Sequence, residues 1–261
     1  MNKSKVEKVN FYSDVLGKEM SMLVYLPECY NSSTPLPVLY FLHGRSGNEN
    51  IMIEMDINTK ADRMIKDGEI KPMIIICPRI ENSRGLNSSL ICKEVSDLGD
   101  NNRIINIGMY EDYFMKEIIV LIDKTFNTIK DRKGRYIGGA SAGGYAALHN
   151  AFRHQHMFLK VGGHMPALEL ELEDKPYFKD MGVWEKYDPI YIARNNNISL
   201  DIDVYLDAGD KDEGRFYEGC SILHKKLKEK GINSQNHVFP GNHNAEYIQS
   251  NIEKYLKFYG C

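Results

Sequence analysis

The sequence has no excess of positive charge and no long apolar run. Its 33 lysine and arginine residues are outnumbered by 36 acidic residues, which gives a formal net charge of −3. A chain without a basic field is a poor candidate for binding nucleic acid or anionic lipid. No window approaches the roughly 18 consecutive apolar residues that a membrane-spanning helix needs. We therefore expect no nucleic-acid partner and no membrane partner.

Targeting and cross-linking signals are also lacking. Residues 1–20 alternate charged and apolar side chains, without the unbroken apolar core of a secretory signal, so we expect a soluble, cytoplasmic protein. The five cysteines are scattered and form no C-x-x-C pair, which excludes a disulfide framework and a zinc-finger type of site. We expect no metal and no cofactor. No repeat is present, and 261 residues with 43% hydrophobic content suit a single domain over 1–261.

The order of the predicted elements indicates an α/β fold. The runs "KVEKVNFYS" and "EMSMLVYLP" flank a turn and predict an N-terminal antiparallel hairpin. From residue 37 onward, strand patterns alternate with helix patterns, which predicts a mostly parallel central sheet with helices on both faces. Segment 80–106 is expected to be a long polar loop, and loops of this length inside a domain are usually functional or mobile.

Chemically useful side chains follow the predicted strands. His43, Ser141, Asp212 and His243 each come just after a strand pattern ends. Reactive groups of parallel α/β sheets gather at the carboxyl ends of the strands. The coincidence therefore predicts a site at that edge.

The stretch "GGASAGG" places Ser141 at a predicted strand-to-helix corner as part of a G-x-S-x-G pattern. Only residues with little or no side chain fit beside a serine on such a sharp turn. The turn exposes the hydroxyl at the N-terminus of the next helix, where the amide of Ala142 can stabilise negative charge. The amide of Arg45, which follows His43-Gly44, is the predicted second donor of an oxyanion hole.

A serine nucleophile needs a histidine base and a carboxylate behind it. His243 follows the last predicted strand and precedes the final helix, so it is the candidate base. Asp210 and Asp212 both lie in the loop after the penultimate strand, and the residues alone leave both open as the acid. The guanidinium of Arg45 either enters the pocket or points into solvent.

With these residues in place, the chain resembles the putative esterase family of α/β-hydrolases, which includes esterase D, feruloyl esterases, enterochelin-type esterases and the antigen 85 mycolyltransferases. The similar stretches are "PVLYFLHGRSGNENIM", "YEDYFMKEIIVLIDKTF", "GGASAGGYAAL", "AGDKDEG" and "PGNHNAEY". The resemblance implies the α/β-hydrolase fold, and the Gly-x-x-Asp register of its acid loop selects Asp212.

The resemblance implies a serine esterase that acts on a small-molecule ester through Ser141, Asp212 and His243. An acyltransferase using the same acyl-enzyme is the alternative, followed by a non-catalytic hydrolase-like binding protein. The aromatic-rich insert 164–197 is a candidate cap, equally compatible with simple coverage of the core. The predicted substrate contacts are His43, Gly44, His164 and Trp184. A homo-oligomer is compatible with the sequence.

Overall fold

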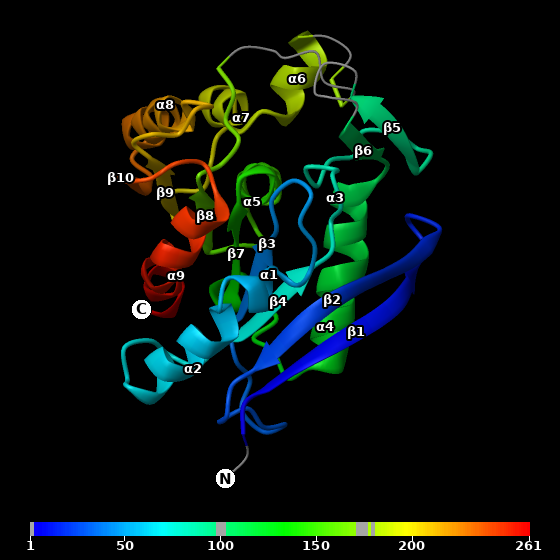
Figure 1. The fold of residues 1–261 in the computed structure, drawn as a ribbon, viewed down its shortest axis with the longest axis vertical. Coiled ribbons are helices and arrows are strands. Elements are labelled where there is room, and N and C mark those ends of the chain that lie inside the picture. The colour runs from blue at the N-terminus through cyan, green and yellow to red at the C-terminus, as the bar shows by residue number, and fades with distance from the viewer. Residues whose placement is uncertain (1–2, 98–102, 171–176, 179–180) are drawn as a thin grey trace.

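The computed structural model describes residues 3–97, 103–170, 177–178 and 181–261 and contains an eight-stranded sheet (Figure 1). The strands run in the spatial order β1-β2-β4-β3-β7-β8-β9-β10. Their bounds are β1 Lys5–Ser13, β2 Lys18–Leu26, β3 Val38–Leu42, β4 Ile74–Pro78, β7 Arg135–Ala140, β8 Lys160–His164, β9 Asp203–Gly209 and β10 Asn233–Phe239.

The pairing of these strands confirms the predicted N-terminal antiparallel hairpin and the mostly parallel central sheet. β1 pairs antiparallel with β2 over the full register from Lys5↔Leu26 to Ser13↔Lys18, and β2 pairs antiparallel with β4. From β4 to β10 all neighbours are parallel. Parallel strands point their carboxyl ends to one edge, so the loops after β3, β7, β9 and β10 meet there.

Helices cover both faces of the sheet, as the alternation predicts. The longer ones are α2 Ile57–Lys66, α5 Ala142–Arg153, α8 Phe216–Glu229 and α9 Ala245–Gly260. The shorter ones are α1 Ile51–Glu54, α3 Tyr110–Asp112, the π-helical η1 Tyr113–Ile118, α4 Ile119–Thr125, the 3₁₀ turn η2 Arg132–Gly134, α6 Met181–Tyr187 and α7 Pro189–Asn195.

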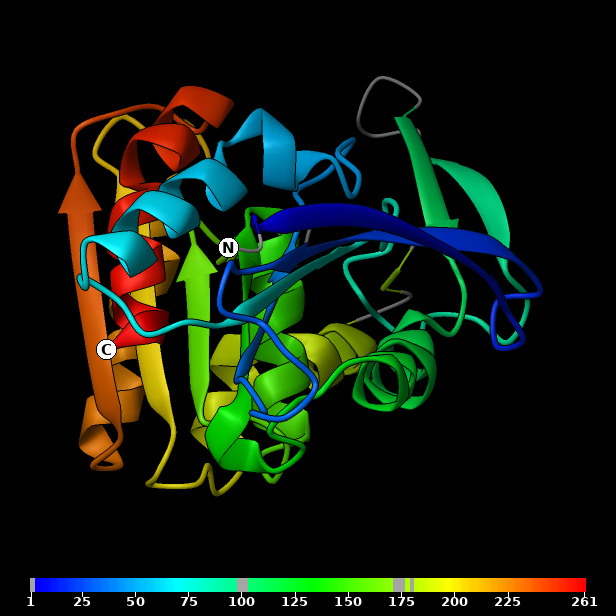
Figure 2. The ribbon, with the colours of Figure 1, turned by 90° about the horizontal axis from the view of Figure 1, so that it is seen from below.

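Two separate hydrophobic clusters show which helices cover which face. Along β3, Tyr40 packs into the cluster under α4, α5 and α8, whereas Leu39 and Phe41 pack under α1, α2 and α9. This alternation follows from the two-residue period of a strand. In Figure 2, α2 (cyan) and α9 (red) lie side by side on their shared face.

Two expected irregular segments contain regular structure. Segment 80–106, predicted as a loop, carries β5 Lys93–Asp97, which pairs antiparallel with β6 Arg103–Ile107 as a separate two-stranded sheet. Most side chains of β5 are exposed, so no apolar alternation marks it in the sequence. Segment 165–197 carries α6 and α7. Among the described residues, no helix is both long and apolar enough to cross a membrane.

Candidate active site

Ser141 lies at a sharp corner between β7 and α5 and has a strained backbone, with φ 53° and ψ −116°. The residues two positions before and after it, Gly139 and Gly143, must be glycines because the packing leaves no room for a side chain there. A Cβ at Gly139 would lie 2.6 Å from the carbonyl oxygen of Gly143, and a Cβ at Gly143 would lie 2.3 Å from the carbonyl oxygen of Leu42. Such strain persists only where the surroundings enforce it. The corner therefore has the geometry of a nucleophile elbow.

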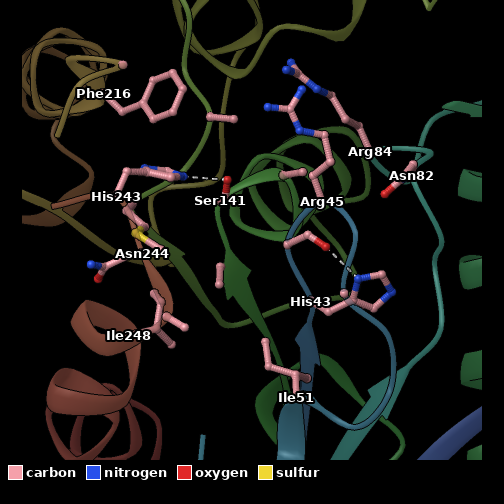
Figure 3. A pocket seen from close by; sticks show the side chains of 18 of the residues that line it. His43, Arg45, Ile51, Asn82, Arg84, Ser141, Phe216, His243, Asn244 and Ile248 are labelled. Carbon is pink, nitrogen blue, oxygen red and sulfur yellow. Dashed lines mark hydrogen bonds between the residues drawn. The ribbon is translucent and has the colours of Figure 1, made fainter. Parts of the chain in front are cut away.

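The structure brings Ser141, His243 and Asp212 into one hydrogen-bonded chain. The Ser141 hydroxyl donates to Nε2 of His243 over 2.8 Å, as the dashed line in Figure 3 marks. Nδ1–H of His243 donates to Oδ2 of Asp212, also over 2.8 Å. The Asp212 side chain is fully buried, and its other oxygen accepts a hydrogen bond from the amide of Gly214. This fixes one tautomer and one orientation of the imidazole.

Asp210, the other candidate acid, has a different partner. Its Oδ1 accepts a 2.9 Å hydrogen bond from the backbone amide of Gly241, and the residue is exposed. It thereby joins the loop after β9 to the loop that carries His243. The structure places Asp212, not Asp210, against His243.

His43 and Gly44 shape the loop beside Ser141. Nδ1–H of His43 donates to the carbonyl of Gly44 over 2.8 Å, and Nε2 accepts from the amide of Ile80 over 3.0 Å. Burial lowers the pKa of His43 to about 4, consistent with a neutral ring. A Cβ at Gly44 would lie 3.3 Å from the carbonyl oxygen of Ala140 and 3.4 Å from Cβ of Ser141, so this backbone runs directly beside the nucleophile. Both nitrogens of His43 are thus used to hold the backbone.

A cavity of about 580 Å³ opens over Ser141 and His243. Arg45 and Ala142, the predicted oxyanion donors, line it, and in Figure 3 the Arg45 side chain rises beside Ser141 on the side away from His243. The remaining lining combines apolar groups with charged ones: Ile51, Met55, Ile248, Glu54, Asp97, Arg103 and Glu213. A pocket of this size and mixture suits a small organic molecule.

Two predicted substrate contacts lie elsewhere. His164 is completely buried, and burial lowers its pKa. Its ring stacks on Tyr255 with centroids 3.6 Å apart. Trp184 is buried, and its ring centroid lies 5.2 Å from that of Tyr191. Neither His164 nor Trp184 is among the described residues that line the cavity over Ser141. A strand end directs alternate side chains to opposite faces, and His164 faces the core under α9.

Sequence reasoning did not single out Phe216 or Arg84, although both line this cavity. Phe216 packs edge-on against the His243 ring, with centroids 5.0 Å apart. Arg84 forms part of the wall, together with Tyr177 from the aromatic-rich insert that was predicted as a candidate cap. The expected loop 80–106 marked the region of Arg84, but an arginine in a polar loop gives no sign that it is buried. Within the part of the chain that the structure describes, no group of three or more acidic, histidine or cysteine side chains could hold a metal ion.

Comparisons with known proteins agree with this architecture. The "Putative esterase" family model matches residues 13–259. An endo-1,4-beta-xylanase/feruloyl esterase of Xylanibacter ruminicola is 28% identical over 85% of this chain, which spans only 29% of that relative. An S-formylglutathione hydrolase of Arabidopsis thaliana is 25% identical over 96% of this chain and 90% of its own.

Solved structures share the fold over the whole chain. A ferulic acid esterase superposes with a TM-score of 0.84 at 22% identity, covering 100% of this chain and 99% of its own. An S-formylglutathione hydrolase from Agrobacterium tumefaciens reaches a TM-score of 0.79 at 19% identity, covering 99% and 95%. The sheet order and the family match together show that this chain belongs to the putative esterase family of α/β-hydrolases, a family of carboxylic-ester hydrolases.

Proposed function

We propose that this protein hydrolyses small carboxylic esters with Ser141 as nucleophile, His243 as general base and Asp212 as the orienting acid. The observation that carries the proposal is the hydrogen-bonded chain from Oγ of Ser141 through the imidazole to Oδ2 of Asp212. A serine hydroxyl is a weak nucleophile until an adjacent base accepts its proton.

In the proposed reaction, Oγ of Ser141 attacks the ester carbonyl while Nε2 of His243 takes the hydroxyl proton. The amides of Ala142 and Arg45 stabilise the oxyanion that forms. Each such donor typically contributes about 10²–10³ in turnover. The C–O bond to the alcohol then breaks, and the imidazolium returns the proton to the leaving oxygen. Water, activated by the same imidazole, hydrolyses the acyl-enzyme and restores Ser141.

Asp212 has a supporting part in this proposal. Its buried carboxylate holds the tautomer in which Nε2 is free to accept a proton. It also stabilises the imidazolium formed in each half-reaction. Phe216 packs against the same ring and restricts its rotation.

The two loops that border the cavity are the proposed substrate-selecting parts. Asn82 and Arg84 come from segment 80–106, and Glu169 and Tyr177 come from segment 164–197. We retain Gly44 as a substrate contact through its backbone. His164 and Trp184 are not included, since both are buried in packing away from Ser141. The relatives named for feruloyl esters and S-formylglutathione make aryl esters and thioesters the first substrates to assay.

Covalent labelling tests the proposal directly. A fluorophosphonate probe is expected to modify the wild-type protein at Ser141, with the site read by peptide mass spectrometry. Ser141→Ala should abolish labelling and lower kcat for 4-nitrophenyl acetate by about 10⁶-fold. Ser221→Ala, an exposed serine of α8, is the matched control and should label normally. A folded wild-type protein that neither labels nor hydrolyses esters would favour a binding role, and ester products formed with added alcohol would favour acyl transfer.

A further inference from the structure

Two tyrosine hydrogen bonds and an ion pair link the two loops that border the cavity. Tyr177 donates its hydroxyl hydrogen to the carbonyl of Asn82 over 2.7 Å, and Tyr187 donates to the carbonyl of Asn87 over 2.6 Å. Between them, Arg84 forms an ion pair with Glu169. Arg84, Glu169 and Tyr177 line the cavity. The hydrogen bond from Tyr187 to Asn87 lies outside the described lining of the cavity.

Arg84 is held in a fixed position. Its Nη1 donates to Oε2 of Glu169 over 2.9 Å, while Nη2 contacts Oε1, so the pair is bidentate. The guanidinium carbon lies 5.0 Å from the ring centroid of Tyr145 and 5.7 Å from that of Tyr177. The side chain is 7% exposed. A planar, buried guanidinium with two aromatic neighbours loses little entropy when it makes a further hydrogen bond.

Backbone hydrogen bonds join the segments that hold Arg84 to the nucleophile. The amide of Tyr145 donates to the carbonyl of Ser141 over 2.9 Å, and the amide of Ala167, two residues before Glu169, donates to the same carbonyl over 3.1 Å. In Figure 3, His243 lies on one side of Ser141, and Arg45 and, beyond it, Arg84 lie on the other. Since the leaving alcohol must face His243 to receive its proton, the acyl group is directed to the opposite side of Ser141, where Arg84 forms part of the cavity wall.

The charge of the ion pair limits what Arg84 can bind. A guanidinium carries five N–H donors, and the bidentate contact uses two of them. The Glu169 carboxylate already neutralises the positive charge and would repel a second carboxylate nearby. An uncharged acceptor oxygen, in contrast, needs only a free N–H edge.

We infer that Arg84 is a specificity-determining residue that donates a hydrogen bond to an uncharged oxygen on the acyl group of the ester. An ether, hydroxyl or carbonyl oxygen at the matching distance from the scissile carbonyl fits this wall. The inference rests on the proposed ester hydrolysis. Glu169 is a positioning residue, because it acts by holding the guanidinium of Arg84.

Matched substrates test the inference. A series of 4-nitrophenyl alkanoates of increasing chain length is assayed beside esters of equal length that end in a methoxy group or a carboxylate. For at least one length, the wild-type protein should prefer the methoxy ester over the alkyl ester by about tenfold in kcat/KM. It should not prefer the carboxylate ester. A preference for the carboxylate, or no preference at any length, would overturn the inference.

Variants then assign the preference to Arg84. Arg84→Met combined with Glu169→Met removes both charges, so neither is left buried without a partner. This double variant should hydrolyse the alkyl ester and lose the methoxy preference. Arg84→Lys keeps the positive charge but lacks the planar guanidinium fork. This variant should retain only part of the methoxy preference. Tyr187→Phe, which breaks the loop contact outside the cavity, should keep the wild-type ratio.

The outcomes separate this inference from the proposed function. If Ser141→Ala shows that wild-type hydrolysis depends on the serine, ester hydrolysis stands whatever Arg84 does. An unchanged methoxy preference in the double variant would then remove Arg84 as its source. An equal loss in Tyr187→Phe would show that loop fastening, not donation by Arg84, sets the ratio. Absence of any serine-dependent hydrolysis would remove both proposals together.

Discussion

His164 and Asp207 form a second Asp–His pair, completely buried beneath the one that contains His243. Nδ1 of His164 lies 3.1 Å from Oδ1 of Asp207, and both side chains have no solvent exposure. The other oxygen of Asp207 accepts hydrogen bonds from the hydroxyls of Tyr247 and Tyr255. Both tyrosines belong to α9, the helix that follows the His243 loop. The buried pair therefore anchors the element that positions His243.

Asp207→Asn is expected to cost about 3 kcal/mol of stability, because the asparagine offers one acceptor oxygen where the carboxylate offers two. Urea unfolding monitored by fluorescence would measure the loss. The hydrogen bonds of His243 to Ser141 and Asp212 do not involve Asp207, so kcat of the folded variant should fall far less than that of Asp212→Asn. A stable Asp207→Asn protein without activity would instead give Asp207 a direct part in the reaction.

The two aspartates of the acid loop should differ sharply in activity. Asp212→Asn removes the charge that holds the His243 tautomer, so kcat should fall by about 10⁴-fold with little change in KM. Asp210→Asn can still accept a hydrogen bond from the amide of Gly241, and its effect should be mild. Steady-state kinetics on one ester would compare them. The reverse order would assign the acid to Asp210.

Local signals made much of this architecture predictable. The alternation of strands and helices gave the parallel sheet, and the glycines around Ser141 gave the corner, because both effects act between residues close in sequence. The choice between Asp210 and Asp212 is different. It depends on which carboxylate meets His243 across the gap between two strands, a contact that the order of residues does not reveal without a family pattern.

Other features depended on distant contacts that leave no local pattern. Arg84 and Glu169 lie 85 positions apart, so nothing near either residue indicates that they pair. His164 ends a strand at the correct edge of the sheet, yet the side-chain alternation turns it toward α9. Trp184 belongs to an aromatic-rich stretch, where packing and substrate contact look alike in sequence.

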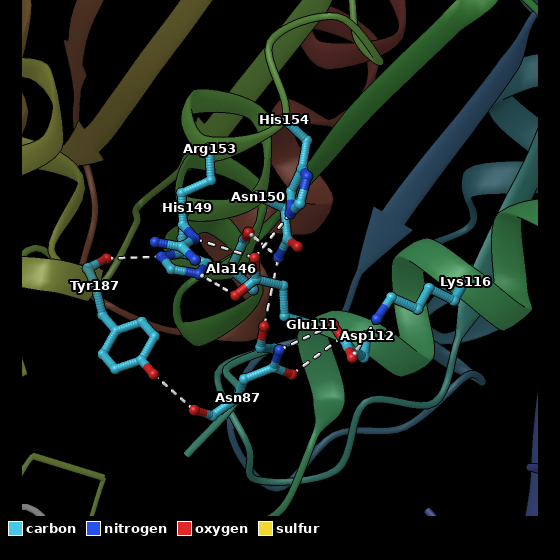
Figure 4. A network of polar contacts seen from close by, with 11 residues as sticks. Asn87, Glu111, Asp112, Lys116, Ala146, His149, Asn150, Arg153, His154 and Tyr187 are labelled. Atoms are coloured by element: carbon cyan, nitrogen blue, oxygen red, sulfur yellow. Dashed lines mark hydrogen bonds and ion pairs between the residues drawn. The ribbon is translucent and has the colours of Figure 1, made fainter. Parts of the chain in front are cut away.

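Glu111 binds three basic side chains at the C-terminal half of α5, the helix that follows Ser141, as Figure 4 shows. Oε1 of Glu111 accepts from Nε of Arg153 over 3.0 Å and from Nε2 of His154 over 2.7 Å, while Oε2 meets Nε2 of His149 at 3.2 Å. Nδ1 of His149 lies 2.8 Å from the carbonyl oxygen of Tyr187. Burial alone would raise the pKa of Glu111, but the hydrogen bonds from the two histidines hold it well below its usual range.

The depressed pKa makes this contribution to stability depend on pH. A carboxyl group with a lowered folded pKa stabilises the protein above its unfolded pKa, about 4.3, and loses that effect as the pH falls through the folded value. Glu111→Gln should therefore destabilise by about 3 kcal/mol at neutral pH, with a difference that shrinks in acid. Thermal unfolding across pH would measure it, with exposed Glu94→Gln as the control. A difference independent of pH would mean that charge plays no part.

Asp188 should show the opposite pH dependence. It precedes α7, where Oδ1 accepts from the amides of Ile190 and Tyr191, while its Oδ2 has no hydrogen-bond partner among the described residues. Burial raises the pKa of Asp188 to about 7. The folded protein therefore holds a proton that the unfolded chain releases above about pH 4, so stability from this group is lost as the pH rises from about 4 to about 7.

Asp188→Asn tests this directly, because the amide oxygen preserves the helix cap and the side chain no longer titrates. The variant should match the wild-type protein in mild acid and equal or exceed its stability above about pH 7, where the wild-type carboxyl group must either stay protonated or be charged in an apolar site. Urea unfolding at several pH values would give both curves, with exposed Asp14→Asn as the control. A variant that is less stable only above neutral pH would show instead that the Asp188 carboxylate is charged and stabilised, since the amide retains the cap in either case.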